Sequence, residues 1–155
     1  MSEHCPQDGG FIGDAGCTHP NHQHSELVKG IIAAAQAKHP RSISASEAEA
    51  ALREGFYVDG VNGKRIGFGK SLLKHFDEDP HAPDDIANRK RLLLFAVDTA
   101  MHPDKTTNNN RSIPGRTAYC KSFNSFGIIA ITGKETEDIE YVFNYVIDGR
   151  MRRKR

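Results

Sequence analysis

Four side chains in the sequence are of the types needed for acid–base chemistry at a phosphodiester: His75, Tyr119, Lys121 and Tyr145. RNA can be cleaved without a metal when a base takes the proton of its 2′-hydroxyl, a cation stabilises the crowded phosphorane and an acid protonates the leaving oxygen. Histidine titrates near neutral pH and serves as base or acid, and lysine supplies positive charge. Tyr119 and Lys121 are two residues apart in a predicted strand, so they share one of its faces. We therefore expect Tyr119 and Lys121 to point to the same side of the sheet.

Further cationic side chains are candidates for holding the phosphates of RNA. Arg111 and Arg116 border a polar loop, and Lys70 begins a predicted helix. His102 ends another predicted helix, where the helix dipole favours a cation. Residues 150–155 contain five basic side chains in six positions. We interpret this tail as a solvated segment, with phosphate binding as the alternative.

The N-terminal residues contain the two side-chain types that zinc prefers, cysteine and histidine. They are His4, Cys5, Cys17, His19, His22 and His24. Their spacing is irregular and contains no paired CxxC, so we interpret residues 1–24 as an irregular leader and expect no stoichiometric zinc or other cofactor. Cys120 falls within a predicted strand, and we expect it to be a small core residue.

The composition limits the class of protein without identifying it. The chain has 155 residues, with 21 Lys and Arg against 20 Asp and Glu, so overall charge does not indicate a nucleic-acid partner. The three cysteines are an odd number, which argues against a full disulfide framework. No apolar run approaches the roughly 18 residues of a membrane span, and no secretory signal is evident. We expect a cytoplasmic protein, or one exported without a cleaved signal, and no membrane partner.

Hydrophobic periodicity and turn residues predict helices first and a sheet last. The expected helices cover residues 25–38, 44–54 (or 46–54), 70–76 and 83–101; the expected strands cover 56–59, 65–68, 116–123, 126–132 and 139–147, with a loop at 104–115. The first two strands should form a hairpin around Asn62-Gly63. The last three should form an antiparallel meander packed on the 84–101 helix. This is an α+β fold: a leader at 1–24, a helical extension at 25–54, a main domain at 55–149 and a basic tail at 150–155.

Several short motifs occur in a defined order between Val61 and Ile147. They are the hairpin Val61–Ile66, the helix Lys70–Phe76 with His75 near its end, the helix Arg91–Pro103, the strand Arg116–Lys121 and the sequence Phe143-Asn144-Tyr145. In this order they resemble the barnase–EndoU–colicin–RelE-like nuclease superfamily, which includes phage-encoded members and toxins. The resemblance covers a little over half of the chain.

The resemblance implies a metal-independent endoribonuclease that leaves a 2′,3′-cyclic phosphate, with RNA and, for a toxin, an acidic immunity or antitoxin protein as partners. It implies a site at His75, Tyr119, Lys121, Asn144 and Tyr145, in which we expect His75, Tyr119, Lys121 and Tyr145 to line one cleft. Asn144 stands where many relatives have Ser or Thr, and an amide cannot donate a proton in acid–base chemistry. That departure favours the alternative, a non-catalytic RNA- or protein-binding accessory domain. A third alternative is a nucleotide-cofactor transferase such as an ADP-ribosyltransferase, for which Glu140 is the only late-strand carboxylate candidate.

Overall fold

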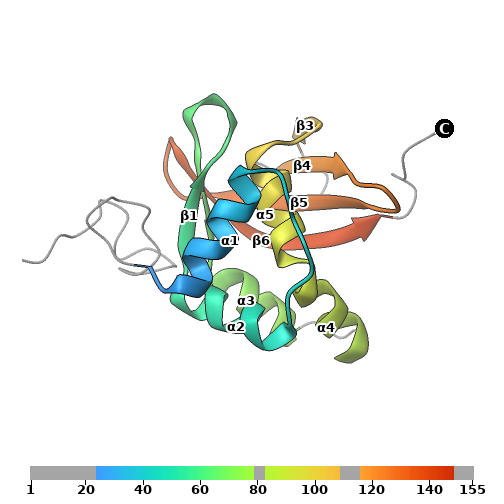
Figure 1. Cartoon of the computed structure of the whole chain (residues 1–155). Coiled ribbons are helices and arrows are strands. Elements are labelled where there is room, and N and C mark those ends of the chain that lie inside the picture. Colours follow the sequence, from blue (N-terminus) through green and yellow to red (C-terminus); the bar gives the residue numbers. More distant parts are fainter. Residues whose placement is uncertain (1–23, 79–82, 109–115, 149–155) are drawn as a thin grey trace, which may run out of the picture.

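The computed structural model describes residues 24–78, 83–108 and 116–148 as an α+β protein (Figure 1). The helices are α1 (Glu26–Gln36), α2 (Ala45–Glu54), α3 (Lys70–Glu78), α4 (Pro83–Arg91) and α5 (Leu93–Met101), with a 3₁₀ turn, η2, at Val61–Gly63. The strands are β1 (Phe56–Asp59), β2 (Arg65–Phe68), β3 (Lys105–Asn108), β4 (Thr117–Ser122), β5 (Gly127–Lys134) and β6 (Ile139–Asp148).

The first two helices begin at the serines that their sequences indicate. The Ser25 hydroxyl accepts the Val28 N–H at the start of α1. Ser44 and Glu47 form a complete capping box at the start of α2, which satisfies two backbone N–H groups that a helix start otherwise leaves unpaired. Gly55 ends α2 with a φ of 80°, a conformation that glycine adopts without strain. These two helices are confirmed.

The hairpin before α3 is also confirmed. β1 pairs antiparallel with β2, from Phe56 opposite Phe68 to Asp59 opposite Arg65. Asn62 and Gly63 turn the chain with φ values of 61° and 75°, which explains why these two residue types occupy the turn. The strands lead directly into α3, so the hairpin fixes where that helix starts.

The expected helix over 83–101 is wrong, because the chain bends at Leu92 and forms two helices. The carbonyl of Arg91 accepts the N–H of Ile43, in the connection between α1 and α2, at 3.0 Å. The Phe95 N–H bonds instead to the carbonyl of Leu92, three residues back. A tertiary hydrogen bond has therefore replaced one that would continue the helix.

The sheet is mixed, with the strand order β1-β2-β6-β5-β4-β3. The expected antiparallel arrangement of β4, β5 and β6 is confirmed. A purely antiparallel meander after N-terminal helices is wrong, because β2 pairs parallel with β6 and the hairpin precedes three of the helices. The expected loop at 104–115 is also wrong in its first part, where residues 105–108 form β3 against β4. Arg111 and the rest of that loop lie outside the described residues.

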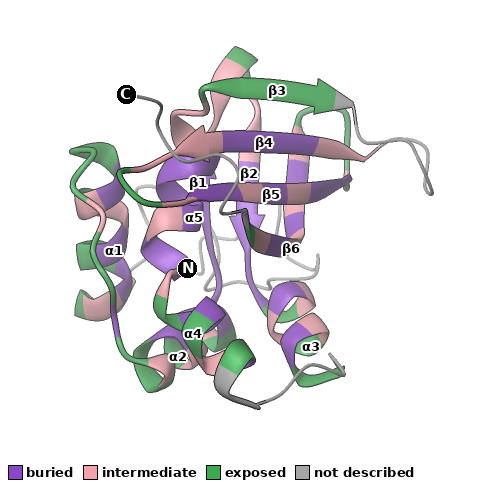
Figure 2. Cartoon of the chain, turned by 90° about the vertical axis from the view of Figure 1, so that its right-hand side faces the viewer, coloured by how far each residue is buried: buried purple, intermediate pink, exposed green. Residues whose placement is uncertain are grey.

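One face of the sheet, which we call the helix face, packs against α5 and holds the core. Tyr119, Ile128, Ala130 and Val142 are buried on it, and α1 contributes Val28 to the same core. The segment 25–54 therefore packs into one core with the rest of the described chain. Burial alternates along β5 from Ile128 to Thr132 (Figure 2). We call the other side of the sheet the opposite face.

Neighbouring isoleucines on β5 provide a test of the two faces. Ile128 is fully buried on the helix face, whereas Ile129 is only half-buried on the opposite face. We expect Ile128→Ala to lower the free energy of unfolding by about 2–5 kcal/mol through lost burial and a residual cavity. Ile129→Ala should cost roughly 1 kcal/mol. Urea denaturation followed by circular dichroism measures both, and equal or reversed costs would contradict the assignment of faces.

Candidate functional site: a cluster at the bulge of strand β6

Strand β6 contains a β-bulge at Phe143. Ile131 of β5 pairs with Asn144, but the next residue, Thr132, pairs with Val142, so β6 has one additional residue at this point. Val142 and Tyr145 are three residues apart and yet both are fully buried on the helix face. Strict alternation would place them on different faces. The bulge therefore directs the half-buried pair between them, Phe143 and Asn144, away from the core.

Helix α3 brings a histidine to this bulge. Leu72 and Phe76 bury the inner side of α3, and the Phe76 ring meets Tyr145 edge-on with centroids 5.5 Å apart. His75 precedes Phe76, and its imidazole lies edge-on to Phe143 with the ring centroids 5.7 Å apart. Packing of Phe76 thus fixes the position of the imidazole.

An arginine stacks on the same phenylalanine. The guanidinium carbon of Arg116 lies 3.6 Å from the centroid of Phe143, a close cation–π contact. Its Nη1 atom is buried and makes no hydrogen bond with the described residues. Leaving a buried N–H donor unsatisfied is costly, so an acceptor that reached this nitrogen would be bound favourably.

A second arginine reaches the bulge from α4. Nη1 of the buried Arg89 donates to Oδ1 of Asn144 at 3.4 Å, and the Arg89 carbonyl accepts the Tyr145 hydroxyl. The next residue, Lys90, donates to Glu49 of α2 at 2.6 Å and so fixes α4. That hydrogen bond lowers the pKa of Glu49. We call His75, Arg89, Arg116, Phe143 and Asn144 the bulge cluster.

The bulge cluster contains three of the residues that the sequence predicted for the site: His75, Asn144 and Arg116. The other two, Arg89 and Phe143, are not among the residues that the sequence predicted for the site. Arg89 lies in a run of three basic residues at the end of α4, which is the signal that was available. Four of the five side chains carry N–H donors, two of them as guanidinium groups, and no member carries a carboxylate, so the cluster suits an anion such as a phosphodiester.

Tyr119, Lys121 and Tyr145 do not join His75 in one cleft, because they lie on the helix face. Tyr119 is buried and donates to Oε1 of Glu140 at 2.7 Å. Burial, and then this hydrogen bond, raises the pKa of Tyr119 well above its usual range. Burial likewise raises the pKa of Tyr145. The Lys121 ammonium donates to Asp98 of α5 at 3.2 Å. These polar groups satisfy one another inside the fold.

The remaining predicted residues have other surroundings. Lys70 is exposed at the first position of α3. Nε2 of His102 donates to the Ala35 carbonyl at 3.2 Å and so joins the end of α5 to the end of α1. Glu140 is buried and accepts hydrogen bonds from Tyr119 and Thr132, which accounts for its carboxylate in structural terms.

The leader residues that could bind zinc are mostly outside the described residues: His4, Cys5, Cys17, His19 and His22. Nδ1 of His24 lies 3.5 Å from Oε2 of Glu54, which also accepts the Ser25 N–H. Within the described ranges, no group of three or more His, Cys, Asp or Glu is arranged to hold a metal ion. Cys120 is buried, as expected of a core residue.

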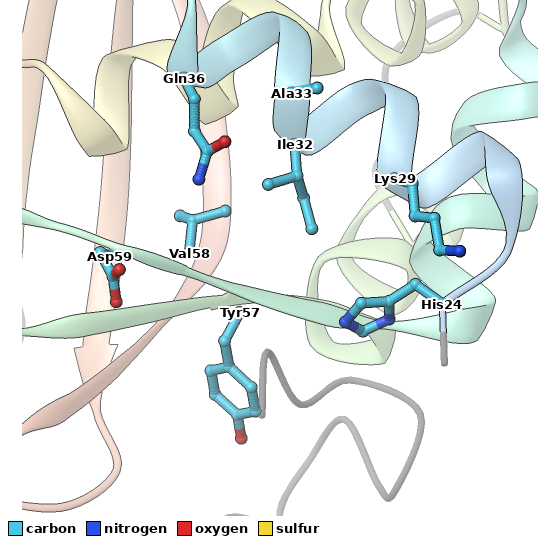
Figure 3. A pocket seen from close by; sticks show the side chains of 8 residues that line it. All are labelled: His24, Lys29, Ile32, Ala33, Gln36, Tyr57, Val58 and Asp59. Atoms are coloured by element: carbon cyan, nitrogen blue, oxygen red, sulfur yellow. The ribbon is translucent and has the colours of Figure 1, made fainter. Parts of the chain in front are cut away.

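A pocket of about 340 Å³ lies between α1 and β1 (Figure 3). It is lined by His24, Lys29, Ile32, Ala33, Gln36, Tyr57, Val58 and Asp59. Val58 points toward α1, whereas the Tyr57 ring points away from that helix. No member of the bulge cluster lines this pocket, so the pocket and the bulge cluster are separate features of the fold.

Comparison of the chain with protein-family models, curated proteins and solved structures gave no match. Among the described residues, no helix has the length and apolar character needed to cross a membrane. The case for a function therefore depends on the geometry and chemistry of the bulge cluster.

The hydrogen bond between Tyr119 and Glu140 can be tested through stability. Tyr119→Phe leaves the buried Glu140 with one donor fewer, which should cost about 1–3 kcal/mol of unfolding free energy at neutral pH. A raised pKa means that the native state favours the protonated phenol, so its contribution is present below about pH 10 and is lost as pH rises further. The variant should therefore lose less stability than the wild type above pH 10.

Urea unfolding at pH 7 and pH 10.5 measures both effects. A variant as stable as the wild type at pH 7, with an unchanged alkaline loss, would show that this hydroxyl is not held by Glu140.

Proposed function

We propose that the protein is a metal-independent endoribonuclease whose site is the bulge cluster. The observation that carries this proposal is that His75 and Arg116 both contact one ring, Phe143. An imidazole that can exchange protons and a permanent cation with an unsatisfied N–H donor are thereby brought to the same place. These are two of the three functions that RNA cleavage without a metal requires.

In the proposed reaction, the 2′-oxygen of a ribose attacks the adjacent phosphorus. A bond forms between phosphorus and the 2′-oxygen, and the bond to the 5′-oxygen of the next nucleotide breaks. The products are a 2′,3′-cyclic phosphate and a free 5′-hydroxyl. His75 takes the proton of the 2′-hydroxyl or gives one to the leaving oxygen. Arg116 stabilises the phosphorane, and Arg89 adds positive charge while it orients Asn144.

The proposed site differs from the one that the sequence indicated. We assign Tyr119, Lys121 and Tyr145 to the fold, because their polar atoms are engaged with Glu140, Asp98 and the Arg89 carbonyl. The proposed reaction assigns no role to Lys70 or His102.

The second candidate function is RNA binding without cleavage. It is favoured by the composition of the bulge cluster, in which His75 is the only side chain suited to proton transfer and Asn144 cannot take that role. A second proton-transfer group would then have to come from water or the substrate. A transferase is less well supported, because the Glu140 carboxylate is buried and hydrogen-bonded.

RNA as substrate implies that the protein acts in a cytoplasm, either that of the cell producing it or that of a cell into which it is delivered. If it is a toxin, an acidic immunity or antitoxin protein would neutralise it by placing carboxylates on Arg116 and Arg89. We include this partner in the proposal, since carboxylate and phosphate bind the guanidinium fork in the same way.

The proposal predicts cleavage of total RNA in the presence of EDTA, with 2′,3′-cyclic phosphate ends. His75→Ala should lower the rate by a factor of about 10²–10⁴, the usual contribution of one acid or base. Arg116→Ala should also lower it, and Arg116→Lys should recover only part of the loss because lysine lacks the planar fork. His39→Ala and Arg41→Ala are matched controls, since both residues are exposed and lie outside the cluster.

Each outcome separates the candidates. Wild-type rates in both His75→Ala and Arg116→Ala would show that the site lies elsewhere. RNA binding that depends on Arg116, without cleavage of any RNA by the wild type, would establish the second candidate instead.

A further inference from the structure

The pocket between α1 and β1 is lined by a buried histidine whose ring nitrogens lack hydrogen bonds. The His24 side chain is only 10% exposed, and neither Nδ1 nor Nε2 makes a hydrogen bond with the described residues. Nδ1 lies 3.5 Å from Oε2 of Glu54. With a proton on each ring nitrogen, Nδ1 faces this carboxylate and Nε2 can donate to an anion in the pocket. A buried polar atom without a partner is costly, so such an anion would be bound favourably.

The pocket has side chains of opposite charge at its two ends (Figure 3). Lys29 lies with His24 at one end, whereas Asp59 and Gln36 lie at the other. Lys29 and Gln36 are seven residues apart on α1, which separates their backbones by about 10 Å along the helix axis. An anionic group therefore suits one end of the pocket and a cationic group the other.

The middle of the pocket is apolar. Ile32 points from α1 toward β1, and Val58 points back toward α1. The volume of about 340 Å³ is near the lower end of the range for small-molecule sites. The pocket therefore has room for a short carbon chain between the two charged ends.

We propose that this pocket binds a small linear zwitterion, with a carboxylate at the His24 end and an ammonium group at the Asp59 end. The carboxylate accepts hydrogen bonds from the His24 imidazole and the Lys29 ammonium. The ligand's ammonium group donates to the Asp59 carboxylate, and its carbon chain lies against Ile32 and Val58. This site shares no residue with the bulge cluster, so it is a second binding site that does not depend on the proposed function.

The experiment compares probes that have the same carbon chain and different end groups. Isothermal titration calorimetry of the full chain should show saturable binding of 6-aminohexanoate, with a dissociation constant of about 1 mM or lower. Hexanoate and hexylamine each lack one of the charged groups and should bind at least about tenfold more weakly. Trialanine has the same two charges at the ends of a peptide, so its affinity relative to 6-aminohexanoate distinguishes a short peptide from an amino acid as the ligand.

Substitutions at the two ends should have different effects on these probes. Asp59→Asn should weaken 6-aminohexanoate by about tenfold and leave hexanoate unchanged, because hexanoate has no ammonium group. Lys29→Gln should weaken both, since both have the carboxylate. Asp77→Asn and Lys134→Gln are matched controls. Asp77 is exposed and outside the pocket, and Lys134 is as exposed as Lys29 and likewise lies 3.5 Å from a glutamate three residues away.

Two further variants test the buried histidine and the volume of the pocket. His24→Ala removes Nε2 and should weaken 6-aminohexanoate and hexanoate alike. Ala33 lines the pocket and is exposed, so Ala33→Leu should fill part of the volume without removing a charged group or disturbing the core. It should abolish binding of every probe. Thermal unfolding verifies that each variant folds, and Ala33→Leu keeps the test decisive if His24→Ala does not.

The outcomes bear on this inference alone. Equal affinities for 6-aminohexanoate and hexanoate, or wild-type affinity in both Asp59→Asn and Lys29→Gln, would overturn the zwitterion. Wild-type affinity in Ala33→Leu would show that binding occurs elsewhere. The site itself is refuted if neither 6-aminohexanoate nor trialanine binds at concentrations up to about 10 mM. RNA cleavage by the bulge cluster is tested separately and is unaffected by any of these results.

Discussion

The interruption of strand alternation in β6 is the constraint on which the rest of the structure depends. A regular strand would place either Val142 or Tyr145 outside the core, and both are fully buried. The added residue at Phe143 resolves this conflict and leaves Phe143 and Asn144 pointing away from the core. Burial of Tyr145 then holds Phe76 of α3 and the Arg89 carbonyl of α4 against β6. One bulge thus organises the core on one side and the cluster on the other.

The buried polar groups of the helix face are engaged with one another, which is why we place the proposed site elsewhere. Glu140 accepts hydrogen bonds from Tyr119 and Thr132 and lies 3.5 Å from Lys64, and Asp98 pairs with Lys121. A buried carboxylate without such partners would be costly, whereas a satisfied one stabilises a specific packing of strands and helices. These side chains have the residue types of catalytic groups but serve the packing of β4 and β6 against their neighbours.

The sequence predicts local features of this fold well, because local chemistry determines them. Ser25, Ser44 and the Asn62-Gly63 turn mark their elements through caps and backbone preference, and alternation correctly places Tyr119 and Lys121 on one face. Alternation does not reveal which face of the sheet the helices cover. The carboxylates that pair with Tyr119 and Lys121 are Glu140 and Asp98, and they come from other elements. The bend at Leu92 depends on a distant hydrogen bond from Ile43. The parallel pairing of β2 with β6 likewise has no local signal, and neither does the bulge that selects Phe143.

The parallel pair joins Arg65 to Ile139, two residues that are far apart in the sequence. Contacts between such distant residues form late, because a long loop must close before the pairing can repay the lost entropy. His75 and Arg89 belong to the loop that this pairing closes, and Phe143 belongs to the strand that closes it. During synthesis, a chain that ends before β6 lacks both the ring and the partner of Arg89, so the cluster exists only once β6 has been made. Assembly of the cluster is therefore tied to completion of the sheet.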